Sequence, residues 1–184
     1  LEPHFEADTG IDIQWSSMGT GKALEFGRRC DADVLLVHAP PAEKKYIADG
    51  YGKARREIMY NDFVIIGPAS DPAGIKGKSI SEALAALKSK KGTFVTRGDN
   101  SGTHKKEKSL WKSAAIQLPE NEAWYVRASN KMRATINMAE QKEAYTMADR
   151  GSYIKYAFDK GGNPPLKILV EGDKVLLNQY AVLT

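Results

Sequence analysis

Short runs of apolar residues alternate along the chain with segments in which apolar residues recur at helical spacing. Residues 34–37, Val-Leu-Leu-Val, form a continuous apolar run, which predicts a strand buried on both faces. Residues 81–90 carry an apolar stripe through Leu84 and Leu87, and Ser81 can cap the helix that this spacing predicts. The same criteria predict further strands at 11–17, 59–66, 93–96, 124–127, 144–147, 166–171 and 175–183, and further helices at 22–29, 41–49, 101–116, 131–142 and 149–158.

This alternation predicts an α/β protein with mostly parallel strands. Residues 67–74, Gly-Pro-Ala-Ser-Asp-Pro-Ala-Gly, interrupt the alternation with turn-forming residues and mark the best internal boundary. We therefore expect two α/β lobes, each with a mixed, mostly parallel sheet flanked by helices. The first lobe is expected at 1–72 and the second at 73–174, with a strand at 175–184 that crosses back toward the first lobe.

Composition narrows the class of protein only slightly. The 184 residues are 42% hydrophobic and 27% charged, with a mean hydropathy of −0.45, and no apolar run reaches the roughly 18 residues of a membrane span. The net charge of +4 permits an anionic partner without identifying one. A single cysteine, Cys30, excludes a disulfide framework and is expected to be a buried thiol without a role. The chain opens inside an apparent element, so we expect a processed or trimmed N-terminus, and the lack of a visible signal peptide is uninformative.

Two loops carry more Gly, Ser and Thr than a structural turn requires, and each opens a predicted helix. They are residues 16–22, Ser-Ser-Met-Gly-Thr-Gly-Lys, and residues 96–104, Thr-Arg-Gly-Asp-Asn-Ser-Gly-Thr-His. A helix start presents unpaired N–H groups and a partial positive charge of about half an electron. Glycines allow a bound group to approach the backbone, hydroxyls donate without charge, and Arg97 adds five fixed donors. Together these features are typical of a cradle for an anion.

A purely structural interpretation stands beside this one. Thr20, Asn100 and Ser101 can be plain N-caps, and the glycines can be plain turn residues. Either loop alone favours that interpretation, but two such loops with Arg97 in one of them favour anion binding. Neither loop matches a Walker motif or a dinucleotide fingerprint, so a nucleotide is not expected.

Three blocks of sequence resemble the periplasmic tungstate-binding proteins of bacterial ABC-type tungstate importers. They are residues 19–40, 59–68 and 97–107, and the resemblance continues through 144–151 and 170–173 in family order. It implies the type II fold of periplasmic binding proteins, in which two lobes close around one tungstate or molybdate. It further implies delivery of the anion to an ABC permease in the inner membrane, from the periplasm or the extracytoplasmic face.

The resemblance also implies a set of ligand-binding residues. Arg97, Ser101 and Thr103, with Gly102, are expected to bind the anion from one lobe, and Thr20 with Gly21 from the other. No cofactor, resident metal or enzymatic activity is implied, because tungsten is bound only as its oxyanion, and the protein is expected to be a monomer. Family members begin with a strand that carries a Thr/Ser-rich ligand loop and continue past the equivalent of 180–182 with helices. The first lobe is therefore expected to be incomplete in this chain.

The chemistry of the anion agrees with such a site. Tungstate and molybdate are dianions without a proton at neutral pH, so hydrogen-bond donors suit them and an acceptor would repel them. Asp99 is the one carboxylate in the loop, and we expect it to bond the N–H groups of its own loop or to pair with Arg97. The sequence does not distinguish tungstate from molybdate.

Other functions are weighed against this one. Ser101 and His104 lie three residues apart, but the Gly-x-Ser-x-Gly elbow of hydrolases is absent and His104 is expected to be an exposed first-turn residue. The spacing of the three histidines does not match a metal site. Leu110 and Trp111 are expected to be the buried stripe of a basic helix, so nucleic acid is not an expected partner. The remaining alternatives are a ligand-sensing effector domain of a transcription regulator and a binding protein for sulfate or phosphate.

Four large aromatic residues are assigned to packing. Trp15 and Trp124 lie in predicted strands and are expected in the core. Tyr153 and Tyr156, three apart on a predicted helix, can line a cleft or pack, and packing is the preferred interpretation.

Overall fold

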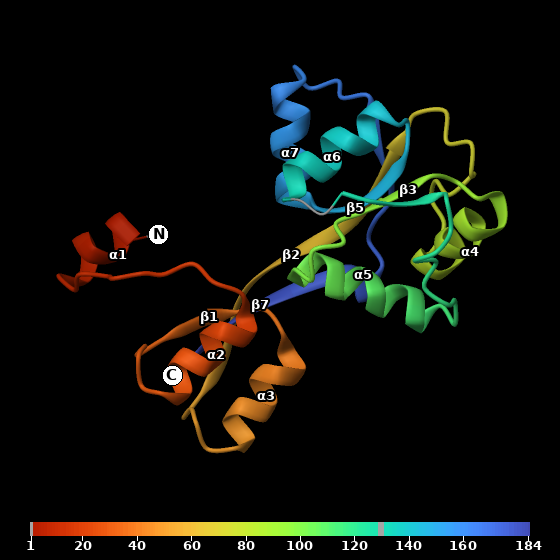
Figure 1. Ribbon diagram of the computed structural model, residues 1–184. Helices are drawn as coiled ribbons and strands as arrows, with labels where there is room; N and C mark the ends of the chain where they lie inside the picture. Colours follow the sequence, from red (N-terminus) through yellow and green to blue (C-terminus); the bar gives the residue numbers. More distant parts are fainter. Residues whose placement is uncertain (1, 129–130) are drawn as a thin grey trace.

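The chain folds into two lobes joined by two long strands, β2 and β7 (Figure 1). This computed structural model describes residues 2–128 and 131–184. The helices are α1 (Glu2–Thr9), α2 (Thr20–Arg28), α3 (Pro40–Ala48), α4 (Ile80–Lys90), α5 (Gly102–Ser113), α6 (Met132–Gln141), α7 (Arg150–Asp159) and the short 3-10 helix η1 (Lys174–Leu176). The strands are β1 (Leu35–Val37), β2 (Arg55–Pro68), β3 (Phe94–Thr96), β4 (Tyr125–Arg127), β5 (Tyr145–Asp149), β6 (Leu166–Val170) and β7 (Leu177–Leu183).

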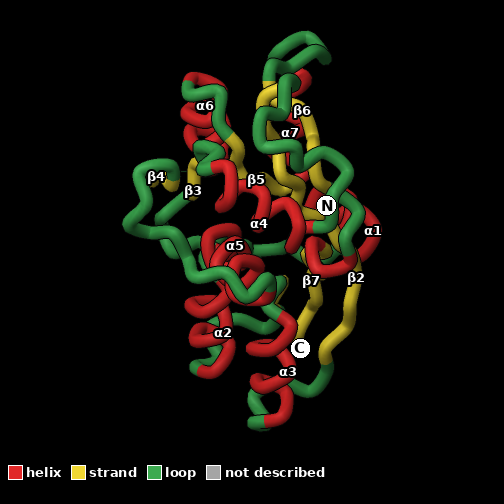
Figure 2. The backbone as a smooth tube through the Cα atoms, turned by 90° about the vertical axis from the view of Figure 1, so that its right-hand side faces the viewer, coloured by secondary structure: helices red, strands yellow, loops and turns green. Residues whose placement is uncertain are grey.

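The first lobe consists of β1, α2, α3 and the adjoining ends of β2 and β7. Its strands pair antiparallel in the order β1-β7-β2. Leu24 of α2 and Tyr46 of α3 pack on this small sheet against Leu35, Val37 and Leu183. In Figure 2, β2 and β7 run side by side out of this lobe toward the second.

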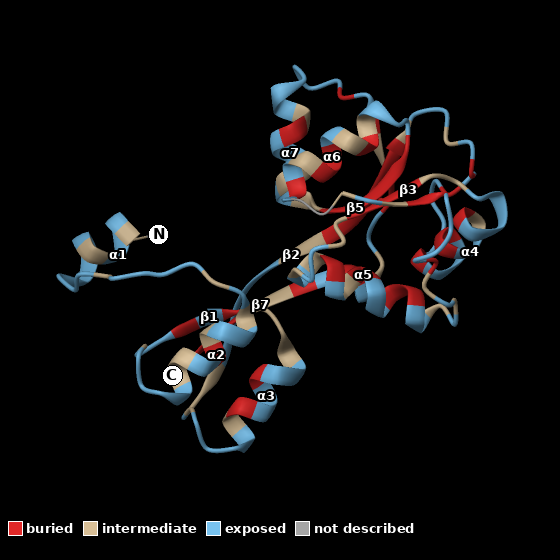
Figure 3. Cartoon of the chain, in the orientation of Figure 1, coloured by how far each residue is buried: buried red, intermediate tan, exposed pale blue. Residues whose placement is uncertain are grey.

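The second lobe holds the larger core, on both faces of its sheet. The strand order is β2-β5-β3-β4, with β6 on the other side of β2. Helices α4 and α5 cover one face, where Leu84 and Trp111 are buried, and α6 and α7 cover the other, where Ile136 is buried. Figure 3 shows β3 and β5 as almost wholly buried between these helices. Such a two-sided core makes this lobe a rigid base for the loops at its strand ends.

The α/β class and the mixed sheet with flanking helices are confirmed, but the expectation of mostly parallel strands is wrong. Four of the six pairings among the described residues are antiparallel, and only β3–β4 and β3–β5 are parallel. The difference arises because β2 and β7 cross between the lobes in opposite directions and pair with each other. An apolar run does not encode the direction of its partner, so its pattern could not predict this.

One predicted strand is absent from the structure, and another is less buried than expected. Residues 11–17 form no strand but an irregular segment that leads from α1, which stands away from both lobes in Figure 1. Trp15 is therefore 69% exposed and not in the core, since no described strand pairs with its segment. Residues 35–37 do form a strand, yet Leu36 is 50% exposed because β1 is an edge strand with one buried face.

Four smaller expectations are corrected or confirmed by the local structure. The N-cap of α4 is Ser79 and not Ser81, because Ser79 forms a reciprocal capping box with Glu82. Cys30 is exposed rather than buried, just after the end of α2. Burial of Trp124 is confirmed, as is the packing of Tyr156 with its neighbour on α7. The division of the chain at residues 72 and 174 remains a prediction.

Candidate functional site

The loop between β3 and α5 is held in shape by its own side chains. Ser101 is the N-cap of α5, and its hydroxyl accepts a hydrogen bond from the N–H of His104 at 3.3 Å. Gly98 and Asn100 take left-handed backbone angles, with φ of 62° and 57°, which a glycine and an asparagine tolerate best. The carboxylate of Asp99 accepts from the N–H of Ser101 at 3.1 Å. Ser101 is thus confirmed as an N-cap. The conformation of the loop is held by hydrogen bonds among its own residues.

Arg97 and Asp99 form an ion pair at the start of this loop. Nε and Nη2 of Arg97 donate to the same oxygen of Asp99, at 3.1 and 2.5 Å, which confirms the expected role of Asp99. Burial alone would raise the pKa of Asp99, but hydrogen bonds from Ser101 and the Arg97 guanidinium hold that pKa below its ordinary value. Within the described part of the chain, Nη1 of Arg97 has no hydrogen-bond partner, so the guanidinium retains donors for an anion.

His104 is buried, with 2% of its surface exposed, and not an exposed first-turn residue. Its Nδ1 accepts a hydrogen bond from the N–H of Asn100 at 3.0 Å, because the loop folds back over the first turn of α5. Burial lowers the pKa of this imidazole, with the charge of Lys108 as a smaller cause. His104 is therefore a neutral structural acceptor, and it is not placed to act as a base for Ser101.

Glu107 is a functional candidate that the sequence reasoning missed. Its carboxyl is 3% exposed and accepts hydrogen bonds from Thr96 at 2.7 Å, Tyr125 at 2.5 Å and the indole of Trp111 at 3.3 Å. Thr96 immediately precedes Arg97 and Glu107 lies on α5, so this hydrogen bond ties the strand before the loop to the helix after it. Burial raises the pKa of Glu107 to about 7. The available signal was a glutamate at helical spacing from Leu110, on the stripe that was expected to be apolar.

The predicted ligand residues at the start of α5 are adjacent in the structure. Ser101 precedes the helix, and Gly102 and Thr103 are its first two residues. Gly102 is exposed, while Ser101 and Thr103 are half-buried. Arg97 lies in the loop that leads into this helix start and is linked to Ser101 through Asp99, and the role of these residues as ligands stays a prediction.

The predicted residues of the other lobe lie at the start of α2. Thr20 is the first helical residue and Gly19 is the N-cap, which has no side-chain capping bond. The interpretation of Thr20 as a plain N-cap is therefore wrong. A Cβ added at Gly19 or Gly21 would meet nothing within 4 Å, so this helix start is open. No hydrogen bond or ion pair among the described residues joins Thr20 to the α5 loop.

The first lobe does reach the α5 loop through His38, which follows β1. A Cβ added at Gly102 would lie 3.1 Å from Cε1 of the His38 ring and 3.8 Å from its Nε2. The sequence reasoning gave His38 no role. His38 is thus a first-lobe side chain that lies against the first residue of α5.

Two surface hollows lie away from the residues of the α5 loop. One of about 500 Å³ borders the C-terminal end of α5, from Lys108 to Leu118, and one of about 290 Å³ lies between α6 and α7. Neither of these two hollows is lined by residues 97–103, which form the candidate anion cradle. Among residues 2–128 and 131–184, no cluster of His, Cys, Asp or Glu side chains could hold a metal ion. The same residues contain no helix long and apolar enough to cross a membrane.

The fold and this loop define a binding protein of the periplasmic type. Residues 1–184 match the sequence model of a PBP superfamily domain, and the chain belongs to this family. The tungstate-binding protein TupA of Campylobacter jejuni is 45% identical over 183 residues, which cover the whole chain and 68% of that protein. TupA of Peptoclostridium acidaminophilum is also 45% identical, over 186 residues that are 63% of its length. The chain therefore spans about two thirds of these curated relatives.

Solved structures give the same result. The tungstate-binding protein TupA from Desulfovibrio alaskensis shares 58% identity, with a TM-score of 0.93, covering 99% of this chain and 73% of that one. A tungstate ABC transporter structure from Geobacter sulfurreducens shares 46% identity, with a TM-score of 0.78, covering 98% and 75%. The resemblance to tungstate-binding proteins is confirmed, and these relatives are named for binding and transport, not for catalysis.

Proposed function

We propose that this chain captures tungstate, or molybdate, for an ABC importer, and that the anion binds at the start of α5. The observation that carries the proposal is the loop of donors at 97–103, found in a chain 58% identical to a tungstate-binding protein. Arg97 supplies charge, Ser101 and Thr103 supply hydroxyls, and Gly102 lets the anion approach the first N–H groups of α5. Thr20 and Gly21 donate from the first lobe when the lobes close.

The donor set suits a dianion without a proton. The one carboxylate of the loop, Asp99, has both its oxygens engaged by Arg97 and Ser101, so it does not present an acceptor to the ligand. A site for hydrogen phosphate would gain from such an acceptor. Closure of the lobes would exclude water and strengthen each hydrogen bond.

The partner of this binding protein is an ABC permease, and its compartment is the periplasm or the extracytoplasmic face of the membrane. Support comes from a neighbour of known structure that is named a tungstate ABC transporter. The proposed oligomeric state is a monomer, because the two lobes of a single chain together form one binding site. Light scattering with and without tungstate tests that state.

A regulatory effector domain is the second candidate function. A structure described as the LysR substrate-binding domain of a putative periplasmic protein from Wolinella succinogenes shares 46% identity and a TM-score of 0.72, covering 99% of this chain and 77% of that one. OxyR from Corynebacterium glutamicum, at 14% identity and a TM-score of 0.68, shares the fold alone. An export signal in the full-length gene would favour the importer, and a helix-turn-helix module would favour the regulator.

A thermal-shift panel with tungstate, molybdate, sulfate and phosphate tests the proposal. A ligand that binds only the folded chain raises its melting temperature, so we expect large shifts with tungstate or molybdate and small ones with sulfate and phosphate. A shift with phosphate alone would contradict the proposed function, and so would the absence of a shift with all four anions.

A further inference from the structure

The His38 ring lies where the two lobes meet, with one edge toward the start of α5. Its Cε1 and Nε2 face Gly102, where an added Cβ would approach to 3.1 and 3.8 Å. Gly102 is the first residue of α5, next to its N-cap Ser101. The edge of the imidazole that carries Nε2 is therefore presented to the proposed anion cradle.

The orientation of this ring is fixed by the two strands that join the lobes. Nδ1 of His38 lies 3.1 Å from the amide oxygen of Asn178 on β7. The amide nitrogen of Asn178 in turn donates to Asn61 on β2 at 2.9 Å. The ring also stacks on Tyr180, with centroids 4.8 Å apart and planes inclined by 26°. An amide oxygen only accepts, so Nδ1 must carry a proton, and Nε2 has no partner among the described residues.

The acidic groups on the elements around His38 are engaged by other donors. Asp62 on β2 is bound by Arg150 at 2.6 Å, and Glu43 on α3 is bound by Arg55 at 2.8 Å. Asp149 caps α7 by accepting from Ser152. None of these carboxylates is left to neutralise a charged imidazole at the cradle.

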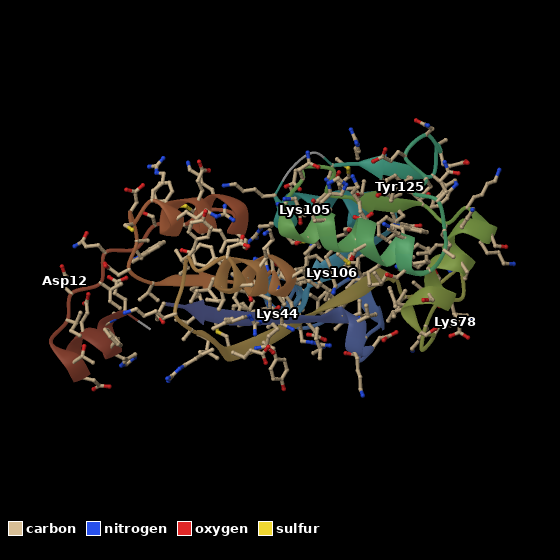
Figure 4. The ribbon with its side chains drawn as sticks, turned by 90° about the horizontal axis from the view of Figure 1, so that it is seen from below. Asp12, Lys44, Lys78, Lys105, Lys106 and Tyr125 are labelled. Carbon is tan, nitrogen blue, oxygen red and sulfur yellow. The ribbon has the colours of Figure 1, made fainter. Side chains whose placement is uncertain are left out.

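Asp99, in the loop before α5, is likewise engaged by Arg97 and by the N–H of Ser101, and other groups nearby are neutral or positive. Lys105 and Lys106 belong to the first two turns of α5, and Arg97 lies in the loop before it. Figure 4 shows both lysines in the part of α5 that lies toward the first lobe, with Lys44 on α3. The imidazole of His104 accepts from Asn100, and burial raises the pKa of Tyr180, which keeps its hydroxyl neutral.

We propose that His38 is a further ligand-binding residue of this site, which donates through Nε2–H to the bound oxyanion and takes up a proton as the anion binds. The inference rests on the proposed function. Since Nδ1–H stays on Asn178, a donor at Nε2 requires the charged imidazole. A fully deprotonated dianion attracts the charged imidazole. The affinity for the anion therefore rises as the pH falls through the range in which histidine titrates.

Three variants separate the two nitrogens. His38→Asn retains a group at the position of Nδ1, where it can still bond Asn178, but does not reach the cradle. His38→Gln places a neutral amide near the position of Nε2. Gly102→Ala sets a methyl group against Cε1 at 3.1 Å and displaces the ring without changing it. The exposed His4 on α1, changed to Gln, is the matched control.

Calorimetry with sodium tungstate measures the affinity and, in buffers of different ionisation enthalpy, the protons taken up. We expect His38→Asn and Gly102→Ala to weaken binding about tenfold to a hundredfold, as for a lost charge-assisted hydrogen bond. His38→Gln should bind with an intermediate affinity that no longer rises at lower pH, and proton uptake should fall by about one relative to wild type. His4→Gln should match wild type in both measurements.

The outcomes distinguish this inference from the proposed function. If all three site variants bind tungstate with the same affinity and the same proton uptake as wild type, the role of His38 is overturned and the oxyanion site is not. An unchanged melting temperature of the ligand-free variants would show that any loss of binding is not a loss of folding. A wild-type chain that binds no oxyanion would overturn both.

Discussion

Glu107→Gln tests whether the buried carboxyl that holds the α5 loop makes the free energy of unfolding depend on pH. Gln keeps the shape of the side chain, and its amide can still bond Thr96, Tyr125 and Trp111, whose donors surround Glu107 in the structure. Like the protonated acid, the amide carries one acceptor oxygen and one donor group, and it differs from the acid in being unable to ionise. The wild-type pKa of Glu107 is raised to about 7 from the ordinary 4.5 by burial.

The magnitude follows from that difference in pKa. A group whose pKa is higher in the folded state stabilises the fold most below its unfolded pKa, and this contribution is lost as the pH rises to the folded value. For Glu107 the window runs from about 4.5 to about 7, and 2.5 units correspond to about 3 kcal/mol. The free energy of unfolding of Glu107→Gln, relative to wild type, should therefore increase by up to that amount across the window.

Urea unfolding of both chains, followed by tryptophan fluorescence between about pH 4.5 and 8, measures this difference. The slope is the test, since a fixed loss from imperfect hydrogen bonding would shift all points equally. Exposed Glu122, changed to Gln, controls for the loss of one negative charge. A difference between Glu107→Gln and wild type that stays flat with pH would refute the reasoning.

Three further substitutions test other parts of the structure. Ser79→Ala removes the capping box with Glu82, and should lower the free energy of unfolding by about 1 kcal/mol in urea titrations; an unchanged midpoint would contradict the cap. In the structure the buried N–H of Ala73 donates a hydrogen bond to the Tyr145 hydroxyl at 2.8 Å. Tyr145→Phe removes this acceptor and should lower the free energy of unfolding by about 1–3 kcal/mol in the same assay. Thr103→Val keeps the size of a half-buried side chain but removes a donor, and should weaken tungstate binding without lowering the melting temperature of the ligand-free chain; equal affinity would exclude Thr103 from the site.

The predicted elements were mostly right because each has a local cause. The stripe through Leu84 and Leu87 predicted α4, and the cap at Ser101 predicted the start of α5. Strand direction was wrong, because pairing is decided by segments distant in sequence, such as the crossing of β2 and β7. Residues 11–17 have a strand pattern, but a strand also requires a neighbour for its backbone groups.

The candidate site was predictable where it is continuous in sequence and not where it is assembled across the fold. Arg97 and Asp99 lie two residues apart, so their pairing could be expected from the loop alone. His38 meets Gly102 across 64 positions of sequence, and only the arrangement of the two lobes brings them together. Glu107 was missed for another reason. Its helix is rich in lysine, and this composition suggests that the glutamate is exposed to solvent as the lysines are.

Calorimetric titration of wild type and Arg97→Ala with tungstate tests the central claim most directly. The account predicts tight binding of one anion to wild type. Loss of the Arg97 guanidinium removes charge-assisted bonds and should weaken that binding by at least about a hundredfold, while the ligand-free melting temperature changes little because the Arg97 pair with Asp99 is confined to the loop. Equal affinity of Arg97→Ala and wild type for tungstate would contradict an oxyanion site at the start of α5.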